Sequence, residues 1–212
     1  NAINLIDGLD GLSTGISIIS CVSLLIIFAL NGSTILSIIL ITALIGALVG
    51  FLPYNFNPAK TFIGDVGSNF LGYTISIISI FGVAKTYTAI VIALPLIVLA
   101  FPVFDTLSTI VRRLVKGKSL KAIFTADAGH VHHKMLKKGL SQKQAVLILY
   151  ALSAALGVFA IVLMQDGVIK ALSFLMVLIV VIAIGYKEVV NHLIEENEKL
   201  KDTIIEVNKL LE

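Results

Sequence analysis

The sequence contains no tryptophan, one cysteine and four prolines among 212 residues, and only 14% of its residues are charged. The single thiol, Cys21, cannot form a disulfide within the chain, which excludes a disulfide-stabilised scaffold. The scarcity of charge excludes a disordered chain, whose composition would be polar and highly charged. Because tryptophan is absent, any aromatic belt at a membrane surface must consist of tyrosine and phenylalanine.

Apolar residues are abundant: 58% of the chain is hydrophobic, and its mean hydropathy is +1.02. A water-soluble domain of this size could not bury so much apolar surface, so the sequence predicts a membrane protein. The net charge is +3. In a membrane protein this excess indicates positively charged cytoplasmic loops rather than a nucleic-acid interface.

Six long apolar stretches predict an all-α, polytopic membrane protein with six transmembrane helices in this chain. Most stretches approach the ~20 residues needed to cross a ~30 Å hydrocarbon core as helices. They cover residues 14–30, 35–52, 70–84, 87–104, 145–164 and 168–186. We expect the short stretch 70–84 to include residues 67–69, and Pro95 and Pro102 to kink the fourth span.

The connecting segments are tight turns on one side of the membrane and long polar loops on the other. Residues 105–144 alone carry nine Lys or Arg side chains, whereas the tight turns offer only Lys85 and Lys170. This asymmetry places the long loops, and the tail after residue 186, in the cytoplasm. Ser141 and Gln144 form a capping box that predicts the start of the fifth span.

The C-terminal segment, residues 187–212, has a pattern of its own. Apolar residues and Asn197 alternate at spacings of three and four, as in a short heptad seam. This pattern predicts either a parallel coiled-coil homodimer or a single amphipathic helix that lies on the membrane or on the protein's own loops. We therefore divide the chain into residues 1–186, the C-terminal part of a membrane-embedded domain whose N-terminal spans are missing, and the cytoplasmic tail.

Three polar clusters lie in the predicted cytoplasmic segments. The first is residues 1–12, in which amides and carboxylates recur every three residues and so form one polar stripe on a helix or a helix-to-loop transition. Its polar residues are Asn1, Asn4, Asp7 and Asp10, with Gly8 and Gly11 between them. Two carboxylates and two amides suit a hydrated Mg²⁺ and a polar ligand. The alternative is a capped helix start followed by a turn.

The second cluster is the loop 55–68. Asp65 stands between two glycines and could hold a metal, with Ser68 and backbone N–H groups near a phosphate. Lys60 adds positive charge, and Phe62 offers a ring on which a base could stack. The alternative is a simple loop in which Asp65 caps a helix.

The third cluster is the segment 127–134, which holds His130, His132 and His133 within four residues. These histidines are too close together for a usual zinc ligand set, and no cysteine accompanies them. Imidazoles followed by lysines are better suited to hydrogen bonds with phosphate oxygens. The alternative is a solvated basic loop. Together the three clusters favour phosphoryl transfer, which depends on positioning and charge neutralisation.

The motifs in these clusters resemble those of the polyprenyl-phosphate N-acetylhexosamine-1-phosphate transferases (glycosyltransferase family 4). The matching segments are residues 1–12, 57–68 and 130–136, and they occur in the family's order over roughly residues 1–164. The His-x-His-His form, with Asp105 and the Arg112–Arg113 pair upstream, resembles the branch that uses UDP-N-acetylglucosamine. The peptidoglycan branch usually has three consecutive histidines.

The resemblance implies that N-acetylglucosamine 1-phosphate passes from UDP-N-acetylglucosamine to undecaprenyl phosphate, with release of UMP. It implies Mg²⁺ as cofactor, with Mn²⁺ as an alternative, bound by Asp65 and Asn4. The implied catalytic residues are Asp7, Asp65, His132 and His133. Gly8, Leu9 and Asp10 would meet the uracil, Phe62 would stack on it, and Asn55 would lie near the nucleotide. His130, His132 and His133 would contact the phosphates.

Several alternatives remain open at this stage. Asp7 could activate or orient the acceptor phosphate, bind the metal, or form a covalent intermediate. The donor could instead be UDP-N-acetylmuramoyl-pentapeptide, as in the peptidoglycan translocase, and a non-catalytic membrane scaffold is the alternative of another class. A transporter is disfavoured because no charged side chain lies deep in a span. The family also carries an Asp-Asp motif in an earlier loop that this sequence lacks, so we expect the fragment alone to be inactive.

Overall fold

The computed structural model describes residues 1–83, 89–117, 130–165, 167, 168, 170 and 172–176, which form helices and no strands. The all-α class is thus confirmed. The chain divides into two compact units, Asn1–Gly167 and Val168–Glu212. In the second unit, residues 172–176 are helical and expose Leu172 and Met176. Most of the sixth predicted span and the whole predicted tail, 187–212, lie outside the described residues.

Four helices in the described part of the chain are long and apolar enough to cross a membrane. They are α2 (Leu12–Leu30), α3 (Ile35–Asn55), α4 (Gly64–Val83) and the helix Gln142–Gln165. They correspond to four of the six predicted spans. The third is longer than its apolar stretch, as expected, because α4 begins at Gly64 and includes residues 67–69.

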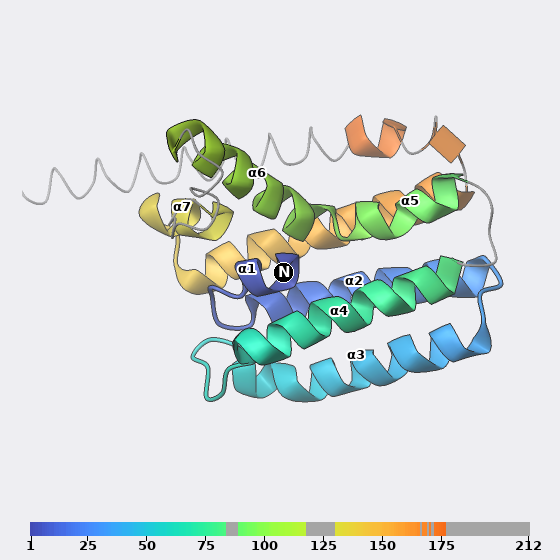
Figure 1. Cartoon of the computed structure of the whole chain (residues 1–212), viewed down its shortest axis with the longest axis horizontal. Coiled ribbons are helices and arrows are strands. Elements are labelled where there is room, and N and C mark those ends of the chain that lie inside the picture. Colours follow the sequence, from blue (N-terminus) through green and yellow to red (C-terminus); the bar gives the residue numbers. More distant parts are fainter. Residues whose placement is uncertain (84–88, 118–129, 166, 169, 171, 177–212) are drawn as a thin grey trace, which may run out of the picture. The chain divides into compact units, whose positions relative to one another are not determined.

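The helix α2 is the central one of these four. It packs against α3, α4 and α5 (Figure 1). About 67% of its most apolar window is buried inside the protein, against 17% for α3. The outward face of α3 presents Ile35, Leu36 and Ile39, each more than half exposed. In a membrane this face meets lipid, where exposed apolar side chains carry no penalty.

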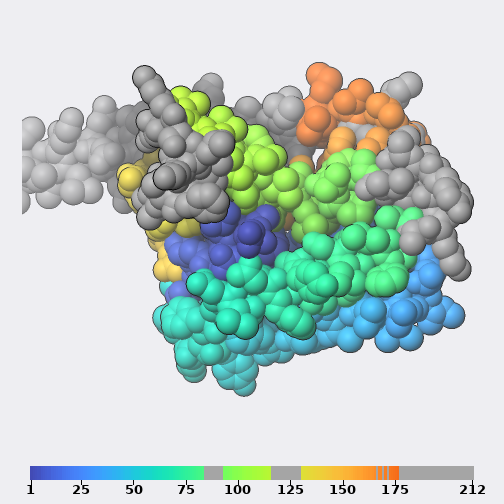
Figure 2. Space-filling model, viewed as in Figure 1, coloured from blue at the N-terminus to red at the C-terminus, as the bar shows by residue number. Residues whose placement is uncertain are grey.

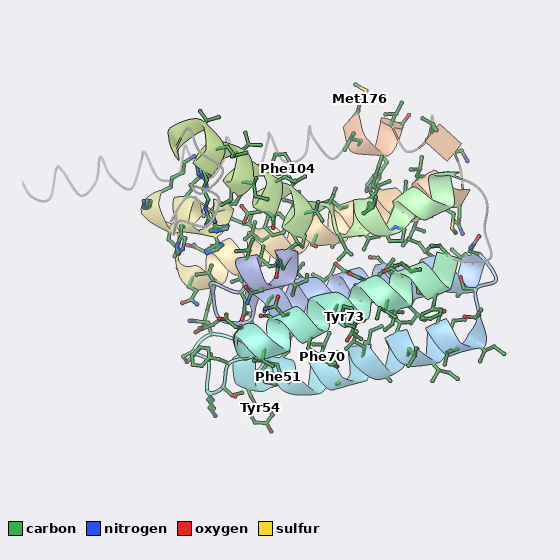
Figure 3. The ribbon with its side chains drawn as sticks, viewed as in Figure 1. Phe51, Tyr54, Phe70, Tyr73, Phe104 and Met176 are labelled. Carbon is green, nitrogen blue, oxygen red and sulfur yellow. The ribbon has the colours of Figure 1, made fainter. Side chains whose placement is uncertain are left out.

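Exposed aromatic side chains lie on α3 and α4, where Tyr54, Phe70 and Tyr73 are 58%, 66% and 68% exposed (Figure 3). Tyrosine combines an apolar ring with a polar hydroxyl and suits the boundary between hydrocarbon and water. These residues can therefore serve the role that tryptophan often takes in other membrane proteins.

The fourth predicted span is not one helix. The structure divides it into α5 (Ala89–Val98) and α6 (Ala100–Gly117), which are separated at Leu99. The physical reason is Pro102, which has no N–H to donate to the carbonyl of Val98. The break lets α6 approach α1 (Ala2–Ile6). Figure 2 shows the surface of α1 between α4 and α6.

The polar motifs gather at one end of the first unit, on the left in Figure 1. This end holds α1, the start of α2, the loop between α3 and α4, and α7 (Val131–Lys137). The helix Gln142–Gln165 also starts here. Its predicted capping box is confirmed, since Ser141 N–H donates to Gln144 Oε1 at 2.9 Å and Gln144 N–H donates to Ser141 Oγ at 3.3 Å.

The helix Gln142–Gln165 is fastened to α2 through Tyr150. The Tyr150 hydroxyl donates a hydrogen bond to the carbonyl of Gly11, at the start of α2. The ring passes so close to Gly15 that a Cβ atom there would lie 2.0 Å from the hydroxyl oxygen. Glycine at position 15 is therefore required for this close approach.

We predict that Gly15→Ala destabilises the protein by about 1–3 kcal/mol, the usual cost of overpacking a filled core. The added methyl group would displace the Tyr150 ring and break its hydrogen bond to Gly11. Thermal unfolding of the detergent-solubilised protein, followed by circular dichroism, measures the effect.

Gly46→Ala is the matched control, because a Cβ atom at Gly46 meets nothing within 4 Å. Alanine favours a helix over glycine, so this variant should unfold at the same temperature as wild type or higher. An unchanged unfolding temperature for Gly15→Ala would contradict the packing seen at Tyr150.

Candidate active site

The first and second polar clusters meet through Asn4. Its side-chain Nδ2 donates to Asp65 Oδ1 at 3.0 Å and contacts Ser68 Oγ at 2.9 Å. Asn4 lies on α1, whereas Asp65 and Ser68 lie on the first turns of α4. Ser68 is buried, and its hydroxyl also donates to the carbonyl of Gly64 at 2.8 Å. The network fixes the start of α4 against α1 and holds the exposed Asp65 in place.

Asp7 ends α1 and lies near Asp65. Ser13 donates a hydrogen bond to its Oδ1. Burial raises the pKa of Asp7 above its usual 3.8, the Ser13 hydrogen bond lowers it, and the negative charge of Asp65 raises it further. Two carboxylates that repel each other at a water-accessible edge form a site that a divalent cation would stabilise.

The predicted stripe of residues 1–10 is divided by the structure. Only residues 2–6 are helical, and after Asp7 the chain turns away. The carboxylate of Asp10 accepts hydrogen bonds from Asn57 Nδ2 at 2.9 Å and from the backbone N–H of Ala59 at 3.1 Å. Asp10 therefore holds the loop after α3, whereas Asn4 and Asp7 lie with Asp65. The helix is too short to align all four polar residues.

Asn55 also holds this loop. It is buried at the end of α3, where its Oδ1 accepts from Thr14 at 2.7 Å and its Nδ2 donates to the carbonyl of Thr61 at 3.0 Å. Both of its polar groups are thus engaged within the protein. Leu9 is 9% exposed and belongs to the hydrophobic core, and its carbonyl accepts the N–H of Leu12 at 3.0 Å.

Phe62 and Lys60 project from the same loop. Phe62 is 71% exposed, which is unusual for a large apolar side chain outside a lipid-facing helix. Lys60 is exposed as well. The solvent-exposed ring of Phe62 can stack on a base, and the solvent-exposed ammonium group of Lys60 can bind a phosphate.

The three histidines stand at the start of α7. The ring centroids of His132 and His133 are 4.3 Å apart, and the rings of His130 and His132 are stacked at 5.6 Å. His132 is 2% exposed and rests on Gly8, where a Cβ atom would lie 2.4 Å from its Nε2. The third cluster therefore covers the first at the residue that follows Asp7.

Burial lowers the pKa of His132 to about 4, and the neighbouring His133 and His130 lower it as well, while Asp105 acts in the opposite direction. His132 is thus neutral at pH 7. Its buried Nε2 has no hydrogen-bond partner within the described part of the chain.

Two residues at this end were not among the predicted site residues. Asp105 accepts a hydrogen bond at 2.7 Å from His130 Nδ1 and another at 3.0 Å from the backbone N–H of Val131. Gln142 accepts one from Asn57 Nδ2 at 3.0 Å. The sequence singled out Asp105 as part of the family resemblance, without a role or a partner. Gln142 carried no such signal.

Within the described residues, no three His, Cys, Asp or Glu side chains lie close enough to hold a metal ion by themselves. The protein offers instead the two carboxylates of Asp7 and Asp65 and the amide of Asn4. Asn4 faces Asp65 through its amide nitrogen. Its oxygen would face a metal only after a half-turn of the amide group.

We predict that His132 makes the protein acid-sensitive between pH 6.5 and about 4. The buried ring resists a proton that the unfolded chain accepts below pH 6.5, so the stability present above that pH is lost as the pH falls towards 4. The unfolding temperature of His132→Gln should fall less steeply over this range than that of wild type. Lys137→Gln, an exposed position on the same helix, is the matched control, and an identical pH dependence for all three proteins would contradict the prediction.

Comparison with known proteins finds a matching family and similar proteins. The sequence model of glycosyl transferase family 4 matches residues 1–83, which contain Asp7 and Asp65. A Bacillus subtilis protein named "Probable undecaprenyl-phosphate N-acetylglucosaminyl 1-phosphate transferase" is 42% identical over 180 residues, which cover 85% of this chain and 49% of that protein.

Two further relatives are similar over shorter parts of the chain. The decaprenyl-phosphate N-acetylglucosaminephosphotransferase of Mycobacterium tuberculosis is 33% identical over 71% of this chain and 41% of its own length. The phospho-N-acetylmuramoyl-pentapeptide-transferase of Staphylococcus aureus is 37% identical over 76% and 47%. The chain thus spans about half the length of the curated relatives it matches. The shared motifs and this similarity show that the chain belongs to glycosyl transferase family 4.

Proposed function

We propose that the whole protein transfers N-acetylglucosamine 1-phosphate from UDP-N-acetylglucosamine to undecaprenyl phosphate and releases UMP, as the first step in the synthesis of a cell-envelope polysaccharide of the teichoic acid or O-antigen type. The observation that carries the proposal is the hydrogen bond that brings Asp65 to Asn4, three residues before Asp7, with His132 resting on Gly8 directly after Asp7. The B. subtilis relative, whose name includes this activity, supports the choice of donor.

The reaction forms a bond between an oxygen of the acceptor phosphate and the phosphorus that carries the sugar. The bond from that phosphorus to the UMP oxygen breaks, and UMP leaves with the electron pair. An acceptor phosphate monoester is largely dianionic at pH 7, because its second pKa is about 6. The protein therefore needs to position it more than to deprotonate it. Because a carboxylate and a dianionic phosphate repel each other, Asp7 would contribute to this as one of the residues that hold a divalent cation.

The residues present fit Mg²⁺. In nucleotide-dependent enzymes this ion usually takes one or two protein carboxylates and completes its octahedron with phosphate oxygens and water. Asp7 and Asp65 provide the carboxylates, and the amide oxygen of Asn4 is a third donor when its side chain turns. When bound, Mg²⁺ would neutralise charge on the diphosphate. Mn²⁺, which accepts the same oxygen ligands, is the alternative ion.

The remaining residues would hold the donor. The exposed ring of Phe62 would stack on uracil, and the backbone at Gly8 and Leu9, with the loop that Asp10 and Asn55 hold, would form the edge of its pocket. On the opposite side the ligand phosphates would meet the imidazoles of His130, His132 and His133 and the ammonium group of Lys60. Ser68 would keep Asp65 in position.

The proposed setting is the bacterial cytoplasmic membrane, with the end that holds Asp65 and α7 on the cytoplasmic side. The chain is an integral membrane protein by its apolar helices and its family. A soluble nucleotide sugar and a lipid acceptor can meet only at the membrane–water boundary. Residues at the ends of α3 and α4, including Asp65, are suitably placed for this.

We predict that Asp65→Asn lowers turnover by about 100-fold or more, the scale expected when one charge is removed from a preorganised site. The whole protein would be assayed in membranes with Mg²⁺, undecaprenyl phosphate and radiolabelled UDP-N-acetylglucosamine, and label in the lipid phase would be measured together with UMP.

Asn69→Ala is the matched control, since Asn69 is exposed one turn further along α4 and, within the described part of the chain, its side chain bonds to the backbone carbonyl of Asp65 alone. Its turnover should stay within about two-fold of wild type, as expected for an exposed residue outside the site. Product from UDP-N-acetylmuramoyl-pentapeptide alone would replace the proposed donor with that of the peptidoglycan branch. No product from either donor, with a folded protein, would favour the membrane scaffold.

We predict that Asp7→Asn abolishes turnover and yet raises the unfolding temperature at pH 7. The carboxyl group has a raised pKa in the folded protein, so its ionisation costs stability as the pH rises through that pKa, and a neutral amide avoids this cost. The asparagine keeps an oxygen to accept the Ser13 hydrogen bond. Circular dichroism at pH 7 without Mg²⁺ provides the test, and a lower unfolding temperature for Asp7→Asn would assign Asp7 to the fold.

A further inference from the structure

We propose that Asp105 is a positioning residue, which fixes the proton of His130 on Nδ1 and thereby leaves Nε2 as the nitrogen that meets the substrate. The proposal rests on the proposed function, because it assigns the orientation of one histidine in the same site. It is carried by the contacts of Asp105 itself, and nothing in the comparisons assigns a role to this residue.

Asp105 is buried at 2% exposure on α6, six residues after the break at Leu99. A buried carboxylate is expensive unless its oxygens are paired. Here both are: Oδ2 lies 2.7 Å from His130 Nδ1, and Oδ1 accepts the backbone N–H of Val131 at 3.0 Å. His130 is itself 7% exposed, so the pair is shielded from water on both sides.

The polarity of this contact decides the tautomer of His130. An ionised carboxylate can only accept hydrogen bonds, so the hydrogen between the two groups must belong to Nδ1. The other polar group near Nδ1 is the Thr109 hydroxyl at 3.5 Å, which donates its own hydrogen to the carbonyl of Asp105 at 2.9 Å. Thr109 therefore acts as an acceptor towards Nδ1 and favours the same tautomer.

The consequence for chemistry concerns Nε2. With Nδ1 engaged by Asp105, the ring can offer a ligand only its Nε2, which accepts a hydrogen bond when the ring is neutral and donates one to a phosphate oxygen when the ring carries two protons. The same carboxylate holds the backbone at Val131, where α7 begins. One residue thus sets both the position of the histidine segment and the nitrogen that it presents.

Asp105→Asn separates these two functions. The asparagine oxygen can still accept the N–H of Val131, so the start of α7 stays in place. Its amide group, however, donates to Nδ1 where the carboxylate accepted, and this should move the proton of His130 to Nε2. Outer partners of this kind typically contribute about 10- to 100-fold. We expect kcat to fall by about that factor and KM for the nucleotide sugar to change less than about three-fold, because the site geometry is retained.

The test uses the whole protein labelled with ¹⁵N-histidine in lipid bilayers, with magic-angle-spinning NMR of the imidazole nitrogens and His130→Gln to identify the His130 signals. In wild type we expect Nδ1 of His130 protonated, and in Asp105→Asn we expect Nε2 protonated. Thr106→Val is the matched control, because among the residues that the structure describes the Thr106 hydroxyl donates to the carbonyl of Pro102 on its own helix and to no other group. It should change neither the tautomer nor kcat.

Two results would overturn the proposal. One is a wild-type His130 with an unprotonated Nδ1, and the other is an Asp105→Asn variant whose His130 keeps its proton on Nδ1, whatever its turnover. Because the tautomer is read from the nitrogen signals without any substrate, this outcome is independent of the Asp65 assay. A fixed tautomer in a protein that transfers no sugar phosphate would disprove the proposed function and leave the Asp105–His130 pairing intact.

Discussion

The hydrogen bond from Asn4 to Asp65 is the contact on which the candidate site depends. It joins two segments that are 61 positions apart, at the end of a bundle whose interior combines an apolar core with buried serine and threonine side chains. A hydrogen bond between two short side chains tolerates only a narrow range of distances and angles. With Ser68 as a second partner of Asn4, the start of α4 can take only one height relative to α1. The separation of the Asp7 and Asp65 carboxylates follows from that height.

The position of the histidine segment relative to Asp7 and Asp65 depends on steric contact rather than on a hydrogen bond to these acidic residues. Its position depends on a close approach, in which the ring of His132 occupies the space that a side chain at Gly8 would take. A residue without a side chain thus decides how near the imidazoles can come to the acidic pair. Hydrogen bonds set the acidic half of the site and van der Waals contact sets the basic half. The two halves meet within the short loop between Asp7 and Gly11.

Much of the fold was predictable, because apolar runs of this length leave a membrane helix as the main option. The spans at α2, α3, α4 and Gln142–Gln165 follow from composition and capping alone. The break at Leu99 was predicted only as a kink, since a proline removes one hydrogen bond but does not determine how far the helix axis turns.

The three clusters were identified from residue types, and the structure brings together Asn4, Asp7, Asp65 and the histidines. The division of the first stripe, with Asp10 bonded to the loop after α3, depends on contacts across the bundle that no local pattern contains. The same is true of Asp105 and of Tyr150, whose partners lie 25 and 139 positions away.

The segment from His130 to Gln142 is tied down at both ends, to α6 through Asp105 and to the loop after α3 through Asn57. A segment that is fixed at both ends samples fewer backbone conformations than one that is fixed at a single end. The ordering entropy of this segment is therefore incurred when the protein folds and not when a ligand arrives, which favours affinity for a ligand of matching shape. For the segment as a whole to move away from Gly8, it must release the buried carboxylate of Asp105 at one end or the amide pair of Asn57 and Gln142 at the other. The backbone that carries all three imidazoles is therefore restrained from both sides.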